Sequence, residues 1–216
     1  MAKEPMKIKR AEKCKHIIEI ATEVFSEKGF HGALTDEIAE RAGVNKQSMY
    51  YYIGDKEKLY ETVMNNLLDQ TKMYLRAEPD ANECPETKIR RFIYGMSQIA
   101  KMRPLHSIVM RELFAGGGNL PQSLRKDVDN YLENFASSCA EMTKNNKGSN
   151  ASPTVVAWMV FAFFLHWDIT MPFVYESDDC TQHDAVEAVG KNINDKLIDE
   201  VEKLVFKMFD RTNGDR

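Results

Sequence analysis

The stretch from Thr35 to Lys56, TDEIAERAGVNKQSMYYYIGDK, constrains the fold of this chain more than any other part of the sequence. It predicts two short helices joined by a tight break. Thr35 is the expected N-cap of the first helix, because acidic residues follow it where a helix N-terminus favours negative charge. Gly43 can adopt the left-handed conformation that ends a helix, and Asn45 can cap the next one. The two helices should therefore meet at a defined corner.

The second helix of this pair begins with polar residues and continues into an aromatic run. Lys46, Gln47 and Ser48 carry hydrogen-bonding groups, whereas Met49 is the expected buried residue. A polar helix start can address base edges in the major groove, and tyrosine and lysine side chains can address phosphates. The pattern favours a helix-turn-helix, but the motif alone is equally typical of a helical corner with an exposed polar helix.

A longer set of motifs surrounds this stretch. AxxxFxxxGF ends the preceding helix, IAxxAGV runs from Ile38 to Val44, and MYYY-I-x-DKEKL runs from Met49 to Leu59. With these elements in order, residues 17–59 closely resemble the DNA-binding domain of the TetR family of transcriptional regulators. The remainder of the chain fits that family by length and helical character only.

The resemblance implies roles for individual side chains. Gln47 and Ser48 occupy the positions best placed to contact bases, and Asn45 is a further candidate. Gln47 departs from the family, which often has glycine or alanine there; its amide can bond adenine bidentately or lie along the backbone. The positions that face phosphates in the family are occupied here by Thr35, Lys46, Tyr50, Tyr51 and Lys56.

Apolar residues recur at helical spacing along the whole chain, and no sustained strand pattern occurs, so the sequence predicts an all-α fold. The first helix is expected from about Arg10 to Lys28, closed by a glycine cap at Gly29. The resemblance implies an N-terminal three-helix helix-turn-helix domain over residues 1–56. It further implies a larger helical ligand-binding and dimerisation domain over residues 57–216, and a homodimer formed through the last two long helices.

Charge and cysteine content argue against several classes of protein. The net charge of −4 argues against a protein that coats nucleic acid indiscriminately, yet residues 1–16 are basic and suit either a DNA-contacting arm or a solvated tail. The four cysteines are widely spaced without a CxxC pair, which predicts neither a zinc site nor a disulfide framework. No signal peptide is evident, so we expect a cytoplasmic protein with reduced thiols.

The most apolar run, Val155 to Val174, has the length of a membrane span. His166, Asp168 and Pro172 interrupt its second half, so the uninterrupted apolar part is too short to cross a bilayer. A helix that is apolar on all sides is also what a protein uses when two different surfaces bury it. We therefore expect a buried helix with no membrane role.

The family resemblance and linkage together suggest a regulatory mechanism. A small apolar or amphipathic effector that binds among the middle helices would favour a different tilt of the long helix that begins at Lys56. It would release DNA only to the extent that it binds this tilted arrangement more tightly than the other. Repression is the family default. For each pocket candidate, core packing is an alternative role, and the candidates are Met96, His106, Met110, Tyr131, Trp158 and Phe161.

Two other classes of function were compared with this one. An enzyme is not expected, because the sequence has no HExxH or GxSxG motif, and His166 and Asp168 would point apart on a helix. No metal or cofactor is expected either. The second alternative is a DNA-binding dimer of the same architecture that a protein partner controls instead of a small molecule.

The assigned roles predict distinct effects of substitution on DNA binding. Lys46→Ala and Tyr50→Phe should weaken binding to all sequences alike, because phosphate contacts carry no sequence information. Gln47→Ala should instead change the preference at one base pair, which selection of binding sites from a random library would detect. An unchanged preferred site for Gln47→Ala would exclude the base-reading role.

Overall fold

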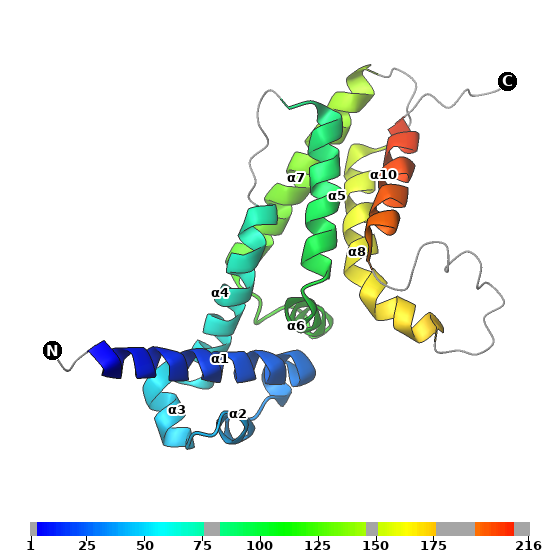
Figure 1. Ribbon diagram of the computed structural model, residues 1–216. Coiled ribbons are helices and arrows are strands. Elements are labelled where there is room, and N and C mark those ends of the chain that lie inside the picture. The colour runs from blue at the N-terminus through cyan, green and yellow to red at the C-terminus, as the bar shows by residue number, and fades with distance from the viewer. Residues whose placement is uncertain (1–3, 76–82, 146–150, 176–192, 210–216) are drawn as a thin grey trace. The chain divides into compact units, whose positions relative to one another are not determined.

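The structure is a computed structural model that describes residues 4–75, 83–145, 151–175 and 193–209 (Figure 1). Within these ranges every regular element is a helix and no strand occurs, which confirms the all-α prediction. The helices are α1 (Glu4–Gly32), α2 (Thr35–Arg41), α3 (Lys46–Ile53), α4 (Lys56–Leu75), α5 (Pro85–Ala100), α6 (Arg103–Phe114), α7 (Gln122–Asn145), α8 (Pro153–Tyr175) and α10 (Asp195–Phe209).

These helices form two compact units. In the first, the described residues up to Thr71 group with Arg103–Arg125; the second combines Lys72–Met102 with the described residues from Lys126 onward. Helix α6 therefore belongs with the N-terminal helices although it follows α5 in the chain. The predicted domain boundary at residue 56 would assign α6 to the C-terminal domain, and this boundary stays a prediction.

The first unit is built on α1. Helical spacing predicts an inner stripe of Ile17, Ile20, Ala21, Val24 and Phe25; all of these are fully buried except Ile20, which is half-buried. Helices α2, α3 and α6 all contact α1, and the Arg111 side chain of α6 donates from Nε to the carbonyl oxygen of Ser26 at 3.1 Å. The helix-turn-helix and α6 are thus fastened to one helix.

Helix α1 extends beyond the predicted limits at both ends. The predicted glycine cap is present, since Gly29 has φ 69° and ψ 178°, but the chain resumes a helical turn that ends at Gly32. Phe30 directly after the break packs edge-on against Tyr60, with ring centroids 4.9 Å apart. This aromatic contact anchors the extra turn, and it depends on α4, which sequence spacing within α1 does not report.

The second unit has its core among α5, α7, α8 and α10, and Figure 1 shows α5 beside α8 and α10. The predicted stripe of α5 is buried throughout, with Phe92 stacked on Phe135 and on Tyr131 at centroid distances of 3.8 and 4.3 Å. Helical spacing also places Leu113 of α6 and both Leu204 and Met208 of α10 on inner stripes, but these three side chains are exposed. The sequence pattern begins the apolar stripe of the last helix at Val186 and Val189, and both lie outside the described residues.

Helix α8 has two different apolar faces. Val156, Val160 and Phe164 are buried in the core, whereas Val155, Trp158 and Met159 are each more than half exposed on the other side. Among the described residues, no helix combines the length and hydropathy that crossing a bilayer requires. The exposed side of α8 therefore needs another explanation.

Close packing of α5 on α7 generates a stability prediction. A Cβ at Gly95 would overlap the Tyr131 hydroxyl, which is buried and donates to the carbonyl oxygen of Phe92 at 2.9 Å. Gly95→Ala should therefore lower the free energy of unfolding by about 1–3 kcal/mol, measured by urea denaturation. Tyr131→Phe in the same chain should recover much of this loss. Gly118→Ala, which enters open space, is the control and should change stability by less than about 0.5 kcal/mol.

Candidate nucleic-acid interface

The corner between α2 and α3 has the geometry expected of a helix-turn-helix. Gly43 has φ 64°, and the amides of Gly43 and Val44 donate to the carbonyl oxygens of Glu40 and Ala39, each at 3.0 Å. The Asn45 side chain then caps α3 by accepting the amide of Ser48 at 2.7 Å. The backbone groups at the turn are thereby satisfied, so the angle between the two helices is defined locally.

The start of α2 differs from the prediction. Leu34 takes the N-cap position and makes no side-chain cap bond, so Thr35 is the first helical residue. The Thr35 hydroxyl instead lies 3.3 Å from the Tyr50 hydroxyl of α3. The residue predicted to cap α2 thus connects the two helices at their outer surface.

One face of α3 is held inward by packing. Met49 is 1% exposed, and Ile38 and Ala39 of α2 are buried against the same α1 stripe. A helix has 3.6 residues per turn, so residues next to Met49 in the sequence lie on other sides of α3. Burial of Met49 therefore turns the neighbouring polar positions outward. Asn45, Lys46, Gln47, Tyr50 and Tyr51 are all exposed, with Tyr51 at 70%.

The remaining predicted DNA contacts are partly covered. Thr35, Ser48 and Lys56 have intermediate exposure. Thr35 and Ser48 lie on the same pair of helices as the exposed set, whereas Lys56 starts α4 and places its Nζ 4.8 Å from the centre of the Phe30 ring. The structure therefore brings the predicted residues of α2 and α3 to one outer surface, with Lys56 at the next helix start.

The sequence did not predict two side-chain contacts on this surface. The Nζ of Lys46 lies 2.9 Å from Oδ2 of Asp36, and this hydrogen bond raises the pKa of Lys46. Arg10 of α1 lies over the Tyr51 ring, with its guanidinium carbon 5.1 Å from the centroid. Both pairs join residues from different helices, so no spacing along the sequence signals them; only the basic composition of residues 1–16 pointed to Arg10.

An ionic network joins α2 to the second half of α1. Arg41 contacts Glu27 and Glu37 at 2.9 and 2.7 Å, and Lys28 contacts Glu37 at 2.6 Å. These partners lower the pKa values of Glu27 and Glu37, the first through the Arg41 bond and the second through the Lys28 bond. The groups are exposed, so their contribution to stability is small, and their main effect is to orient α2.

The six residues predicted to bind an effector divide between the two units. His106 and Met110 are buried in α6, in the first unit. Met96 and Tyr131 are part of the core of the second unit, while Trp158 is 51% exposed and packs edge-on against Phe161. Their role in effector binding stays a prediction.

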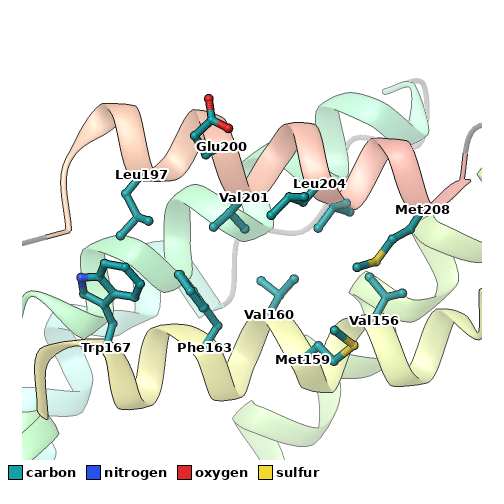
Figure 2. A pocket seen from close by; sticks show the side chains of 11 residues that line it. Val156, Met159, Val160, Phe163, Trp167, Leu197, Glu200, Val201, Leu204 and Met208 are labelled. Atoms are coloured by element: carbon teal, nitrogen blue, oxygen red, sulfur yellow. The ribbon is translucent and has the colours of Figure 1, made fainter. Parts of the chain in front are cut away.

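A groove lined mainly by apolar side chains lies between α8 and α10 in the second unit (Figure 2). It has a volume of about 360 Å³, and Figure 2 shows side chains from both helices pointing into it. Met159, Leu204 and Met208 are 52%, 57% and 39% exposed, and Glu200 is the single charged lining residue. Apolar surface of this kind marks a site for a partner or ligand.

Comparison with known proteins places this geometry in a family. Residues 17–63 match the family of bacterial regulatory proteins described as tetR. The transcriptional regulator RutR of Escherichia coli O157:H7 is 29% identical over 175 residues, which cover 81% of this chain and 82% of that protein. The N-terminal part of the chain has the sequence of a TetR-family DNA-binding region. TetR-family regulators are DNA-binding transcriptional regulators and are not enzymes.

Solved structures agree with this fold assignment. A TetR-like regulator from Rhodococcus sp. RHA1 superposes with a TM-score of 0.63 at 19% identity, covering 90% of this chain and 94% of that one. AibR, in a complex with isovaleryl coenzyme A and operator DNA, gives a TM-score of 0.61 at 15% identity and covers 93% and 100% of the two chains. At these identities the likeness concerns the fold alone.

The Asp36–Lys46 pair generates a prediction for DNA binding. A phosphate must compete with Asp36 for Lys46, and Asp36 adds negative charge at the same surface. Asp36→Asn should therefore tighten DNA binding several-fold at low salt, and steepen the slope of log K against log salt by about 0.9. Fluorescence anisotropy across a salt series measures both. Asp129→Asn, the same change on α7 in the other unit, should alter neither, and weaker binding by Asp36→Asn would contradict the competition.

Proposed function

We propose that this TetR-family protein is a dimeric, sequence-specific DNA-binding repressor that a small apolar or amphipathic effector releases from a palindromic operator. The observation that carries the DNA-binding part is the exposed polar start of α3, capped by Asn45 and held outward by the buried Met49. Such a helix end matches the width and hydrogen-bonding pattern of the major groove.

Each exposed side chain of the helix-turn-helix has a chemically suited target. Gln47 and Ser48 would contact bases, since an amide and a hydroxyl can both donate and accept. Asn45 uses Oδ1 in the helix cap, which leaves its NH₂ group to donate to DNA. The phosphate contacts would come from hydroxyl and ammonium groups, those of Thr35, Lys46, Tyr50, Tyr51 and Lys56.

A homodimer would place two such helices in successive major grooves, about 34 Å apart along the duplex. The groove between α8 and α10 supports this arrangement, because the exposed side of α8 and the exposed Leu204 and Met208 of α10 would be covered by the same helices of a second chain. In a symmetric contact of this kind, the same apolar residues are buried on both chains. It also explains why α8 is apolar on both faces.

Effector control would act through α4. This helix is continuous from Lys56, beside the DNA-contacting residues, to Leu75, and its residues up to Thr71 belong to the first unit while those from Lys72 belong to the second. An effector that prefers one orientation of α4 lowers DNA affinity by its differential affinity for the two states. The complex of AibR with an acyl coenzyme A and operator DNA supports small-molecule control in proteins of this fold.

Control by a protein partner is the second candidate, and one observation favours it. Leu113 and Phe114 at the end of α6 are 49% and 82% exposed, next to each other and outside the α8–α10 groove. An exposed apolar pair is a suitable contact for another protein. A library of cell metabolites that shifts DNA binding of the purified protein would favour the effector, whereas release that needs a second protein would favour the partner.

Selection of DNA from a random or genomic library, followed by sequencing, tests the function. Recovery at two salt concentrations separates sequence-specific binding from attraction to phosphates, because the latter weakens more steeply with salt. We expect one inverted-repeat sequence to dominate at the higher salt concentration. Recovery of no sequence above the background of random competitor would exclude a sequence-specific regulator.

The proposed dimer yields its own prediction. Leu204→Glu places a charge in the apolar groove, so the variant should sediment as a monomer under conditions in which the wild-type chain sediments as a dimer. Its DNA affinity should fall by about 100-fold or more, because each half-site then binds alone. Tyr94→Glu is the matched control, since Tyr94 is also about half exposed but lies on α5 outside the groove. A dimeric Leu204→Glu chain would exclude this interface.

A further inference from the structure

A second cavity, of about 400 Å³, lies within the first unit. Its walls come from the end of α1, from the first half of α4 and from residues 119–123, and they include Phe30, Tyr60 and Met64. None of the six residues predicted to bind an effector lines it. The apolar part of the wall is thus built around two aromatic rings that contact each other.

The Tyr60 hydroxyl is an unsatisfied group in this wall. Tyr60 is 5% exposed, and its hydroxyl makes no hydrogen bond of normal length to the protein. Burial first, and the nearby Glu112 carboxylate second, raise the pKa of Tyr60, so the hydroxyl stays protonated at physiological pH. A buried hydroxyl without a partner is uncommon, and a bound ligand is one way to satisfy it.

The other polar groups of the wall are two carboxylates, those of Glu57 and Glu61, and the side chains of Asn65, Asn119 and Ser123, which can donate or accept. The amide nitrogen of Asn119 is engaged, because it donates to Oε2 of Glu112 at 2.9 Å and lies 3.4 Å from Nε2 of His31. The carbonyl oxygen of Asn119 is therefore the part of the amide left for a ligand. Glu57 and Glu61 add two carboxylates, and Glu57 has no ion-pair partner among the described residues. Glu61 is paired with Lys58 at 2.7 Å, so Glu57 is the carboxylate of the wall that favours a ligand with a positively charged donor.

The ring of Phe30 already attracts a cation. The Nζ of Lys56 lies 4.8 Å from its centroid, within the range of a cation–π contact. The Lys56 contact shows that the Phe30 ring of this wall can bind an ammonium group. The Lys56 side chain is partly exposed, so a second cation can compete with it for the ring.

From these contacts we propose that the cavity is a binding site for a small organic ammonium ion that carries an apolar or aromatic group. The ammonium group would donate to the Glu57 carboxylate and to the Tyr60 oxygen, and the apolar group would lie against Phe30 and Met64. A ligand there competes with Lys56 for the Phe30 ring. Because Lys56 is a proposed phosphate contact, the link from this site to DNA affinity rests on the proposed function, whereas ligand binding itself does not.

Calorimetric titration of the full chain without DNA tests the site. The probe is 2-phenylethylammonium chloride, and the neutral comparison is 2-phenylethanol, which has a hydroxyl in place of the ammonium group. We expect saturable binding at one site per chain with a Kd of about 1 mM or lower, and binding of the alcohol at least about tenfold weaker. Absence of saturable binding, or equal binding of the two compounds, overturns the proposal.

Two variants locate the binding in this cavity. Glu57→Gln removes an exposed charge and Tyr60→Phe removes a hydroxyl that has no partner, so both chains should fold, and each should bind the probe about fivefold or more weakly. Glu86→Gln, an exposed glutamate on α5, is the matched control and should bind as the wild type does. Unchanged binding by both Glu57→Gln and Tyr60→Phe would also overturn the site.

The link to DNA needs a separate measurement. Saturating probe should change the DNA affinity of the wild-type chain and have no effect on that of Glu57→Gln. Calorimetric binding without any change in DNA affinity would retain the site and exclude its coupling through Lys56. Failure of the wild-type chain to bind DNA at all would count against the proposed function and leave the calorimetric result standing.

Discussion

The buried stripe of α1 is the constraint on which the DNA-contacting surface depends. Ile17, Ala21, Val24 and Phe25 are fully buried, and the helices α2, α3 and α6 all pack on α1. Met49 anchors α3 to this core through its inner face, and the polar residues beside it point outward as a consequence. The apolar interior thus determines which side chains of α3 face outward, where the proposed DNA contacts lie.

Placement of α6 in the first unit brings a buried carboxylate close to the end of α1. Glu112, 2% exposed, accepts the amide of Phe30 at 3.4 Å and the amide nitrogen of Asn119 at 2.9 Å. Arg111 beside it bonds the carbonyl oxygen of Ser26. Two neighbouring residues of α6 therefore contact α1 next to the break at Gly29. A shift of α6 would move this end of α1, which leads into α2.

Electrostatics at the recognition surface are partly balanced within the protein. Lys46 is paired with Asp36, Arg10 lies over Tyr51, and Lys56 lies over Phe30. These three cations already have internal partners, so a phosphate at the proposed contacts would exchange one contact for another. Such exchange reduces non-specific attraction to phosphates and leaves a larger share of the discrimination to base contacts. The net charge of −4 acts in the same direction.

The sequence by itself determined the helical class, the corner at Gly43, the Asn45 cap and the outward polar residues of α3, because each follows from local backbone preference or from helical period. It also gave the apolar character of α8. Only the tertiary structure decided that Thr35 joins Tyr50 and does not cap α2, that α6 joins the N-terminal unit, and that Asp36 meets Lys46. These contacts depend on how separate helices pack, and residues far apart along the chain carry no local signal of the surfaces that packing will bring together.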